Sequence, residues 1–313
     1  MSSFQRFISN ISWSVLGKVC VQILLFGVSI LLTRYLGKER LGDYATLLVI
    51  PVFIRLMNSL GLETLINKKL PELNVQDPSG LQGKYLVGRL LVLRFLTTFC
   101  FCILLYFILP FYLDFINYQQ LIEFRWILIL YFIVITVDSI LSTLFMTLLR
   151  FKTLAKTEIL GALLNLILLG LFISLDYGIS GVLYAYIFSA SVTSIIYLVL
   201  ARRQYIGPTK KPEWDDMGHL AWVSYGISFL GFGLMTQSDV LLLNFFNVGR
   251  GDVGLYHLVT GLGGTMAFLL AGVAPMALSL FSETFAKDGI KSLSNLYCQI
   301  VGLASYLTIP IYV

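Results

Sequence analysis

The sequence predicts an all-α, polytopic integral membrane protein, built from two parallel helical repeats of which the second is incomplete. Hydrophobic residues make up 58% of the 313 residues and charged residues only 12%, with a mean hydropathy of +0.85. Soluble domains carry about 25% charged residues. Long apolar runs recur along the chain, and the stretch Thr33 to Tyr44 returns in weaker form at Phe245 to Tyr256. These observations together define the fold class.

The apolar runs have the length of membrane spans, for which about 20 residues are needed. Nine are expected, with a turn-rich, charged linker between the sixth and the seventh. The expected spans are Ile11 to Leu32, Leu41 to Leu60, Tyr85 to Leu109, Trp126 to Leu148, Glu158 to Leu175, Gly178 to Leu200, Leu220 to Leu243, Gly254 to Phe281, and a last run from Leu293.

The distribution of Lys and Arg predicts the orientation. With a cytoplasmic N-terminus, thirteen of these residues fall in loops on the cytoplasmic side, five on the opposite side and four within spans. Because basic residues accumulate in short cytoplasmic loops, we expect the N-terminus to lie in the cytoplasm.

The repeated stretch indicates two lobes. At a constant offset of 212 residues, as between Tyr44 and Tyr256, several glycines coincide. The matching pairs are Gly37 with Gly249, Gly42 with Gly254, and Tyr44 with Tyr256. Matches at one offset indicate an internal repeat. Six spans precede the second copy, so both lobes enter the membrane in the same direction, an arrangement that transporters use to rock around a central site.

The expected domains are an N-terminal lobe of six transmembrane helices (1–204), a cytoplasmic linker (205–218) and an incomplete C-terminal lobe of about three helices (219–313). A second lobe as long as the first would extend well beyond Val313, so we expect this chain to hold only part of it.

Four basic residues lie within spans of the N-terminal lobe: Lys18, Arg55, Arg89 and Arg94. A charge at the bilayer centre costs about 2.5 to 3.5 kcal/mol on insertion scales, so each needs a partner, a wet cavity or access to the interface. One interpretation is a cationic, substrate-binding chamber that opens to the cytoplasm and receives an anionic head group such as a diphosphate. The other is snorkelling toward anionic lipid head groups.

Two acidic residues also lie within spans. Asp138 stands at mid-depth of the fourth span and Asp239 near the outer end of the seventh. Asp138 is expected either to pair with a basic residue of the first or third span, or to take up and release a proton during transport. Asp239 is expected to bind a cation or to hold a local hydrogen-bond network.

An enzymatic role is not expected. The sequence shows no catalytic constellation, no phosphate-binding loop, no metal-ligand cluster, and no sign of a cofactor or of nucleic-acid binding. A membrane-embedded glycan polymerase or ligase generally needs a large outer loop with acid and base residues. The longest outer loop, about Pro110 to Arg125, offers only Asp114 and Glu123.

Several short motifs resemble those of one transporter family. They are Arg34-x-Leu36-Gly37, Leu41-Gly42-x-Tyr44, Gly61-Leu62 followed by Lys68-Lys69, and Asp239 to Leu243 followed by Val253 to Tyr256. The family is that of the polysaccharide transporters, the O-antigen and capsule repeat-unit flippases, within the multidrug/oligosaccharidyl-lipid/polysaccharide (MOP) exporter superfamily.

The resemblance implies twelve to fourteen spans in the bacterial cytoplasmic (inner) membrane. It further implies movement of undecaprenyl-diphosphate-linked oligosaccharide to the periplasmic leaflet, for O-antigen, lipopolysaccharide, capsule or exopolysaccharide synthesis. Lys18, Arg55 and Arg94 would line its cationic cavity. The implied partners are this lipid-linked oligosaccharide, membrane lipids, H⁺ or Na⁺, and polysaccharide assembly proteins. The alternative is a drug/cation antiporter of the same superfamily, relying on Asp138 or Asp239.

Overall fold

The computed structural model describes residues 3–205, 207–211, 217–233, 238–263 and 268–312, and in these ranges the chain folds into helices and short connections. The helices are α1 (Ser3–Met57), α2 (Leu62–Gln76), α3 (Leu81–Phe115), η1 (Gln119–Phe124), α4 (Arg125–Thr147), α5 (Phe151–Ser174), α6 (Gly178–Tyr205), α7 (Met217–Gly233), α8 (Ser238–Phe245), α9 (Arg250–Gly263) and α10 (Phe268–Tyr312). The all-α polytopic fold class is therefore confirmed.

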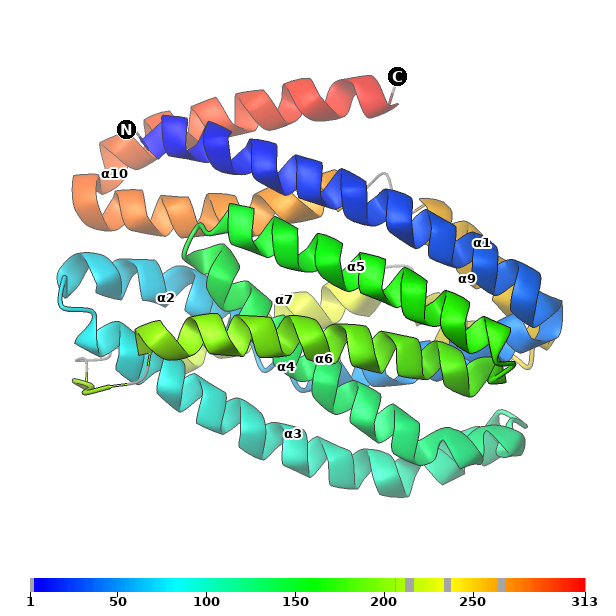
Figure 1. Cartoon of the computed structure of the whole chain (residues 1–313). Coiled ribbons are helices and arrows are strands. Elements are labelled where there is room, and N and C mark those ends of the chain that lie inside the picture. Colours follow the sequence, from blue (N-terminus) through cyan, green and yellow to red (C-terminus); the bar gives the residue numbers. More distant parts are fainter. Residues whose placement is uncertain (1–2, 206, 212–216, 234–237, 264–267, 313) are drawn as a thin grey trace.

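Helix α1 contains the first two expected spans. Its backbone leaves the helical region at Gly37, where φ is 69°, a left-handed value that glycine adopts without steric cost. The chain reverses there, so the segments on either side of Gly37 form two antiparallel spans (Figure 1). Five helices of the described residues are long and apolar enough to cross a membrane, and together they cover the first six expected spans.

The segment after the second expected span differs from the expectation. Residues around Lys68 and Lys69 were expected to form a cytoplasmic loop, whereas they belong to helix α2. This helix begins after a break at Leu60 and Gly61, whose φ values are 47° and 70°. Its leucines and isoleucine recur at helical spacing and are buried, namely Leu62, Leu65, Ile66, Leu70 and Leu73. Such an apolar stripe stabilises a helix even where charges interrupt the hydropathy.

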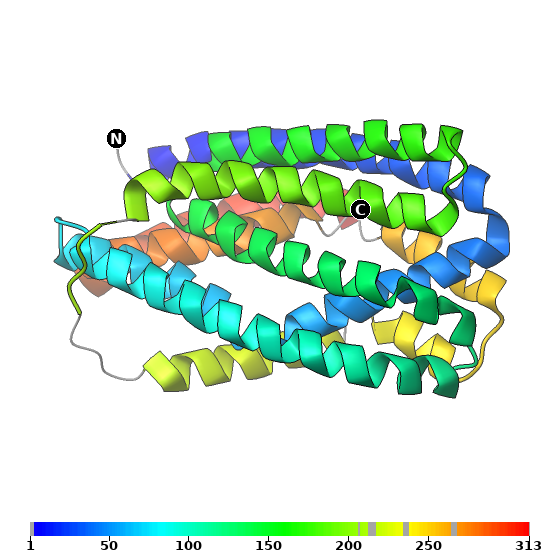
Figure 2. The same ribbon diagram turned by 60° about the horizontal axis from the view of Figure 1, so that its bottom comes forward.

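The helices form a bundle with two distinct ends (Figures 1 and 2). One end, here called the linker end, holds the start of α1, helix α2, the start of α3 and the linker after α6. The other end, here called the Gly37 end, holds the reversal at Gly37, the turn between α5 and α6, and the start of α9. Residues 206 and 212–216 of the expected linker lie outside the described residues.

Large apolar side chains cover the outside of the bundle. On α3 the exposed fraction is 72% for Phe95 and 77% for Phe111, and α5, α6 and α7 carry further exposed leucines, isoleucines and aromatic residues. An apolar surface of this extent is unfavourable in water, but lipid tails solvate it without cost. Arg94 and Asp138 instead turn inward, as is usual for charged residues of membrane helices.

The two copies of the repeated stretch lie directly against each other at the Gly37 end. A Cβ atom on Gly254 would lie 2.7 Å from the backbone nitrogen of Gly42, and one on Gly42 would lie 1.9 Å from the carbonyl oxygen of Arg250. Small residues permit such close backbone approach in membranes. Lys38 pairs with Asp252 at 2.9 Å, and Arg250 lies 3.8 Å from Asp43. Two ion pairs therefore flank the glycine contact, and each copy supplies the basic residue of one pair and the acidic residue of the other.

The contact predicts the effect of one added methyl group. Gly254→Ala places a Cβ against backbone atoms of Gly42, Leu41 and Lys38 that have no freedom to move aside. Overpacking of this kind costs about 1 to 3 kcal/mol. We expect the thermal unfolding midpoint in detergent to fall by several degrees. Gly261→Ala, in the same helix with no atom within 4 Å, is the control and should leave the midpoint unchanged or higher. Equal midpoints for both variants would contradict the contact.

Candidate functional site

An open hollow of about 310 Å³, here called the cavity, lies where α1, α4, α5 and α6 meet, and its lining is mainly apolar with a few charged and polar groups. Three of its lining residues are charged and the others are polar, aromatic or aliphatic. The lining consists of Lys18, Val21, Leu25, Tyr131, Ile135, Asp138, Glu158, Gly161, Ala162, Asn165, Tyr186, Ser189, Ala190, Thr193 and Tyr197. Two residues expected from the sequence to carry function, Lys18 and Asp138, are therefore brought into one cavity.

Lys18 is paired with a carboxylate across this cavity. Its Nζ atom lies 3.3 Å from Oε1 of Glu158, and the exposed fractions of the two side chains are 30% and 25%. An ammonium group in a membrane span needs such a partner or access to water. The pair leaves Lys18 able to exchange Glu158 for another anion that enters the cavity.

Asp138 is held by hydroxyl groups of α6. Thr193 donates a hydrogen bond of 2.6 Å to its Oδ1 atom, and Ser194 donates one of 3.3 Å to the same atom. Arg55, at the end of α1, lies close enough for its charge to act on the Asp138 carboxylate. The second oxygen of the carboxylate remains available for a proton or a cation, because hydroxyl donors occupy only Oδ1.

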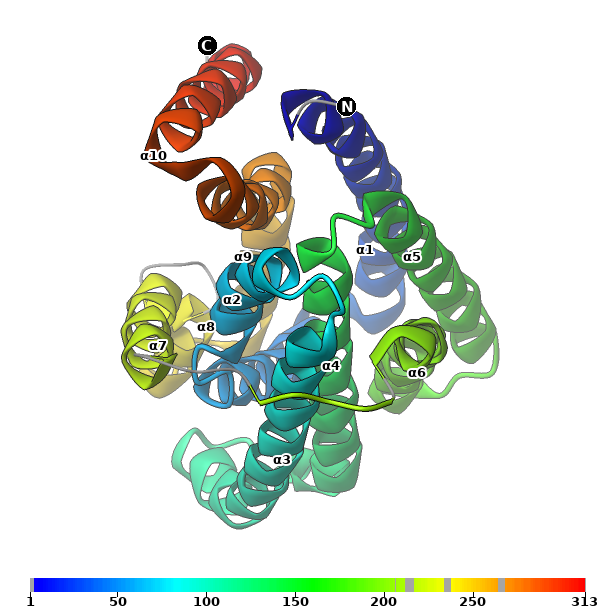
Figure 3. The same cartoon turned by 90° about the vertical axis from the view of Figure 1, so that its left-hand side faces the viewer.

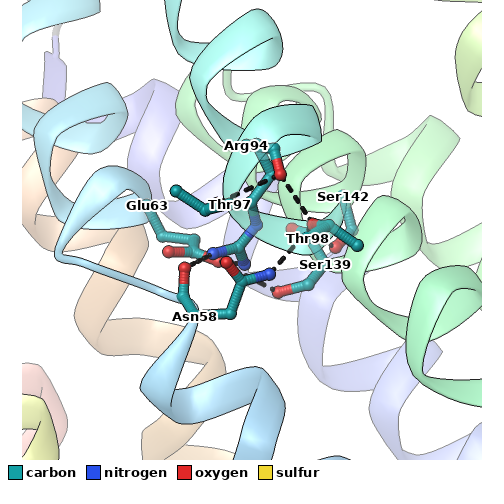
Figure 4. A network of polar contacts seen from close by, with 7 residues as sticks. All are labelled: Asn58, Glu63, Arg94, Thr97, Thr98, Ser139 and Ser142. Carbon is teal, nitrogen blue, oxygen red and sulfur yellow. Dashed lines mark hydrogen bonds and ion pairs between the residues drawn. The ribbon is translucent and has the colours of Figure 1, made fainter. Parts of the chain in front are cut away.

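Arg94 lies in a separate network, deep between α1, α2, α3 and α4 (Figure 4). Its exposed fraction is 3%, and Nη2 lies 2.5 Å from Oε1 of Glu63. Nη1 donates to the backbone carbonyl of Asn58, one of the groups left without a helical partner by the break between α1 and α2. Asn58 in turn donates to Thr98 at 2.9 Å. The guanidinium therefore binds groups on both sides of the break between α1 and α2, namely the Asn58 carbonyl and Glu63.

Arg89 and Asp239 lie elsewhere. Arg89 is exposed on the outer face of α3, in a groove shared with the linker. Asp239 lies in the first turn of α8 (Ser238–Phe245) and accepts a hydrogen bond of 2.5 Å from the hydroxyl of Tyr256, a residue of the repeated stretch. The six expected residues therefore do not form one site. Lys18 and Asp138 share the cavity, whereas Arg89 and Asp239 lie elsewhere and Arg94 lies in its own network. The charge of Arg55 acts on both Asp138 and Arg94.

The sequence marks Glu158 as an acidic residue at the cytoplasmic end of its span, but sequence reasoning did not single out the polar stripes of α5 and α6. Glu158 and Asn165 follow each other at a spacing of seven residues on α5, and Ser189, Thr193 and Tyr197 at spacings of four on α6. Residues three, four or seven apart lie on one helix face. This periodicity, inside otherwise apolar spans, is the signal by which the cavity residues of α5 and α6 can be recognised.

The cavity offers two carboxylates and one ammonium group, so it is chemically suited to exchanging ions rather than to breaking bonds. A cation or a proton fits Asp138, and an anionic group fits Lys18 once Glu158 is neutralised or displaced. Among the described residues, no group of three or more His, Cys, Asp or Glu side chains is placed to hold a metal ion.

The fold is shared with solved membrane transporters. A multidrug resistance MATE family transporter of the MOP superfamily, in an outward-facing conformation, matches with a TM-score of 0.75 at 18% identity. A MOP superfamily transporter from Pyrococcus furiosus, described as having a binding pocket of reversed polarity, matches with a TM-score of 0.73 at 16% identity. Each match covers 97% of this chain and 70% of the other chain.

A further match is the multidrug transporter DinF-BH in complex with R6G, with a TM-score of 0.67 at 16% identity, covering 98% of this chain and 71% of the other. No curated protein matches the sequence significantly. These matches show that the chain shares its fold with MATE transporters.

The family follows from the sequence. Residues 7–282 match the family model described as polysaccharide biosynthesis protein, which is most of the chain. The chain belongs to this family of polysaccharide biosynthesis proteins. The polysaccharide-transporter family expected from the motifs around Gly37, Gly42 and Gly254 is therefore confirmed, and the fold agrees with that of solved MOP transporters.

The Arg94 network predicts that replacing Arg94 alone is more destabilising than replacing Arg94 and Glu63 together. Arg94→Gln leaves Glu63 and the Asn58 carbonyl unpaired, and breaking a buried ion pair by removing one partner costs about 3 to 5 kcal/mol. The thermal midpoint in detergent without added lipid should fall sharply. The double variant Arg94→Gln/Glu63→Gln removes the unpaired charge and should recover part of the loss.

Arg89→Gln is the matched control for Arg94→Gln, because Arg89 lies on the same helix but is exposed. Its effect should stay within about 0.5 kcal/mol, as for surface substitutions. If Arg94→Gln is as mild as this control, the guanidinium does not hold the α1–α2 break together.

Proposed function

We propose that the protein moves lipid-linked oligosaccharide, carried on undecaprenyl diphosphate, from the cytoplasmic to the periplasmic leaflet of the bacterial cytoplasmic membrane. The observation that carries the proposal is the match of residues 7–282 to the polysaccharide biosynthesis family. Lys18 in the cavity, with the charge of Arg55 nearby, supports it, because a diphosphate head group carries negative charge that must be compensated inside the bilayer.

In this proposal the N-terminal lobe (1–204) and the C-terminal lobe (219–313) rock against each other, with the N-terminus in the cytoplasm. The two copies of the repeated stretch, in contact through Gly42 and Gly254, form the junction at the Gly37 end. Lys38 with Asp252 and Arg250 with Asp43 must separate if that end opens. These side chains are partly exposed, so each pair contributes only about 0 to 1 kcal/mol and does not lock the junction.

Lys18 is the residue proposed to meet the head group. In the structure its ammonium is compensated by Glu158, so an entering diphosphate would replace Glu158 as the partner of Lys18, and Glu158 would take up a proton. Asp138, hydrogen-bonded by Thr193 and Ser194, is proposed to bind the coupling H⁺ or Na⁺. Membrane lipids and polysaccharide assembly proteins are the proposed further partners.

A drug/cation antiporter of the same superfamily is the second candidate. Carboxylates outnumber basic groups in the cavity, since Asp138 and Glu158 face Lys18 alone. A surplus of negative charge favours a cationic substrate. Under this alternative Asp138 binds the drug or its counter-ion, and Lys18 only holds Glu158 in place.

One complementation experiment separates the two candidates. The full-length gene is expressed in a strain that lacks its own repeat-unit flippase, and surface glycan is quantified. We expect wild type to restore glycan and Lys18→Gln to lower it at least tenfold at equal protein level, because the cavity loses its ammonium. Lys291→Gln, an exposed lysine of α10, is the control and should restore glycan fully. Drug resistance without glycan would favour the antiporter.

Asp138→Asn tests the coupling role. The amide keeps the size of the carboxylate and its oxygen still accepts from Thr193, but it carries no charge and takes up no proton. In proteoliposomes we expect transport to become insensitive to an imposed H⁺ or Na⁺ gradient. Asp288→Asn, an exposed residue of α10, should keep the wild-type response. An unchanged gradient response in Asp138→Asn would remove Asp138 from the coupling site.

A further inference from the structure

A second hollow lies on the outside of the bundle and is independent of the cavity around Lys18. It is a groove of about 620 Å³ between α3, the linker and the start of α7. Its wall on α3 is formed mainly by Leu90, Val92, Leu93 and Leu96, and Arg89 and Lys211 stand at its polar end. Figure 3 shows the linker passing from α6 across the start of α3 toward α7.

The cationic end of the groove is held in place by backbone and side-chain contacts. The amide of Lys210 donates to the carbonyl oxygen of Leu81 at 3.2 Å, which fixes the linker to the first turn of α3. Arg89 donates to the hydroxyl of Tyr85, one turn earlier, at 3.4 Å, so its guanidinium is directed toward the linker end. Both cations, Arg89 and Lys211, are exposed, and none of the described residues that line the groove is acidic.

The apolar wall continues from this cationic end along α3. Val92, Leu96 and Phe99 recur at spacings of three and four, and their exposed fractions are 60%, 55% and 60%. Residues at this spacing form one continuous face of a helix. From Arg89 to Phe99 the helix rises by about 15 Å, at 1.5 Å per residue, which is comparable to much of an acyl chain.

We propose that this groove binds an anionic glycerophospholipid of the leaflet at the linker end, with the lipid phosphate at Arg89 and Lys211 and an acyl chain along Val92, Leu93 and Leu96. Charge complementarity selects the head group, because two cations face the groove and a neutral lipid would leave them uncompensated by the described lining. Basic pockets between membrane helices bind anionic head groups in this way. The bound lipid would join α3 to the linker and α7. This role is distinct from transport and does not depend on the proposed substrate.

The test uses the full chain, purified and delipidated in detergent, and titrated with dioleoylphosphatidylglycerol or dioleoylphosphatidylcholine. Bound lipid is counted by native mass spectrometry. We expect the first phosphatidylglycerol to bind at least fivefold tighter than phosphatidylcholine. In Arg89→Gln/Lys211→Gln this preference should fall below twofold. The control Lys156→Gln/Lys291→Gln removes two exposed lysines outside the groove lining and should keep the preference.

A second variant tests the apolar half of the groove with its charges intact. Leu93→Trp fills the space along α3 and should weaken phosphatidylglycerol binding at least threefold. If the double variant elutes as an aggregate in size exclusion, Lys211→Gln alone, in the exposed linker, should at least halve the preference.

Three results would overturn the proposal. They are equal binding of the two lipids to wild type, an unchanged preference in the folded Arg89 and Lys211 variants, and displacement of phosphatidylglycerol by undecaprenyl diphosphate at lower concentration. The last result would assign the groove to the route of a transported lipid diphosphate instead.

Discussion

The bilayer core offers no water to polar groups, and the Arg94–Glu63 pair shows how this fold meets that constraint. The chain between α1 and α2 breaks in mid-bundle, where the left-handed residues Leu60 and Gly61 end the helical hydrogen-bond ladder. A broken helix at membrane depth is tolerated only where protein or a wet cavity satisfies its backbone. Arg94 does so for the Asn58 carbonyl, while Glu63 neutralises the guanidinium. The packing of α2, α3 and α4 around the break depends on this pair.

Because the bilayer core holds no water, each charged residue of the spans needs a partner, and these residues have different ones. Arg94 has a structural task, because its side chain is buried and its two Nη groups bind Asn58 and Glu63. Lys18 and Asp138 line a cavity large enough for water, so their charges remain exchangeable. Arg89 faces outward, where a lipid head group is the natural counter-charge. Charged residues of neighbouring spans thus differ in burial and in their partners.

Both copies of the repeated stretch make hydrogen bonds to other parts of the bundle. Gly42 and Gly254 bring the two copies into backbone contact, and Tyr44 of the first copy donates to the hydroxyl of Tyr186, which lines the cavity. Tyr256, the equivalent residue of the second copy, donates instead to Asp239. A change in the junction between the copies therefore acts on hydrogen bonds of the cavity wall and of α8. This is the physical link by which rocking of the proposed lobes would reach the candidate site.

The sequence by itself determined the fold class, the positions of the first six spans and the family, because long apolar runs and the glycines around Gly37 are local properties of the chain. It missed α2, since the lysines of that helix masked its apolar stripe. It also identified Lys18, Asp138 and Arg94 as unusual, since any charge in a span is costly. Only the tertiary structure decided that Lys18 and Asp138 share a cavity while Arg94 closes a helix break. Their partners, Glu158, Thr193 and Glu63, come from other helices, and helix packing, not spacing along the chain, brings such side chains together.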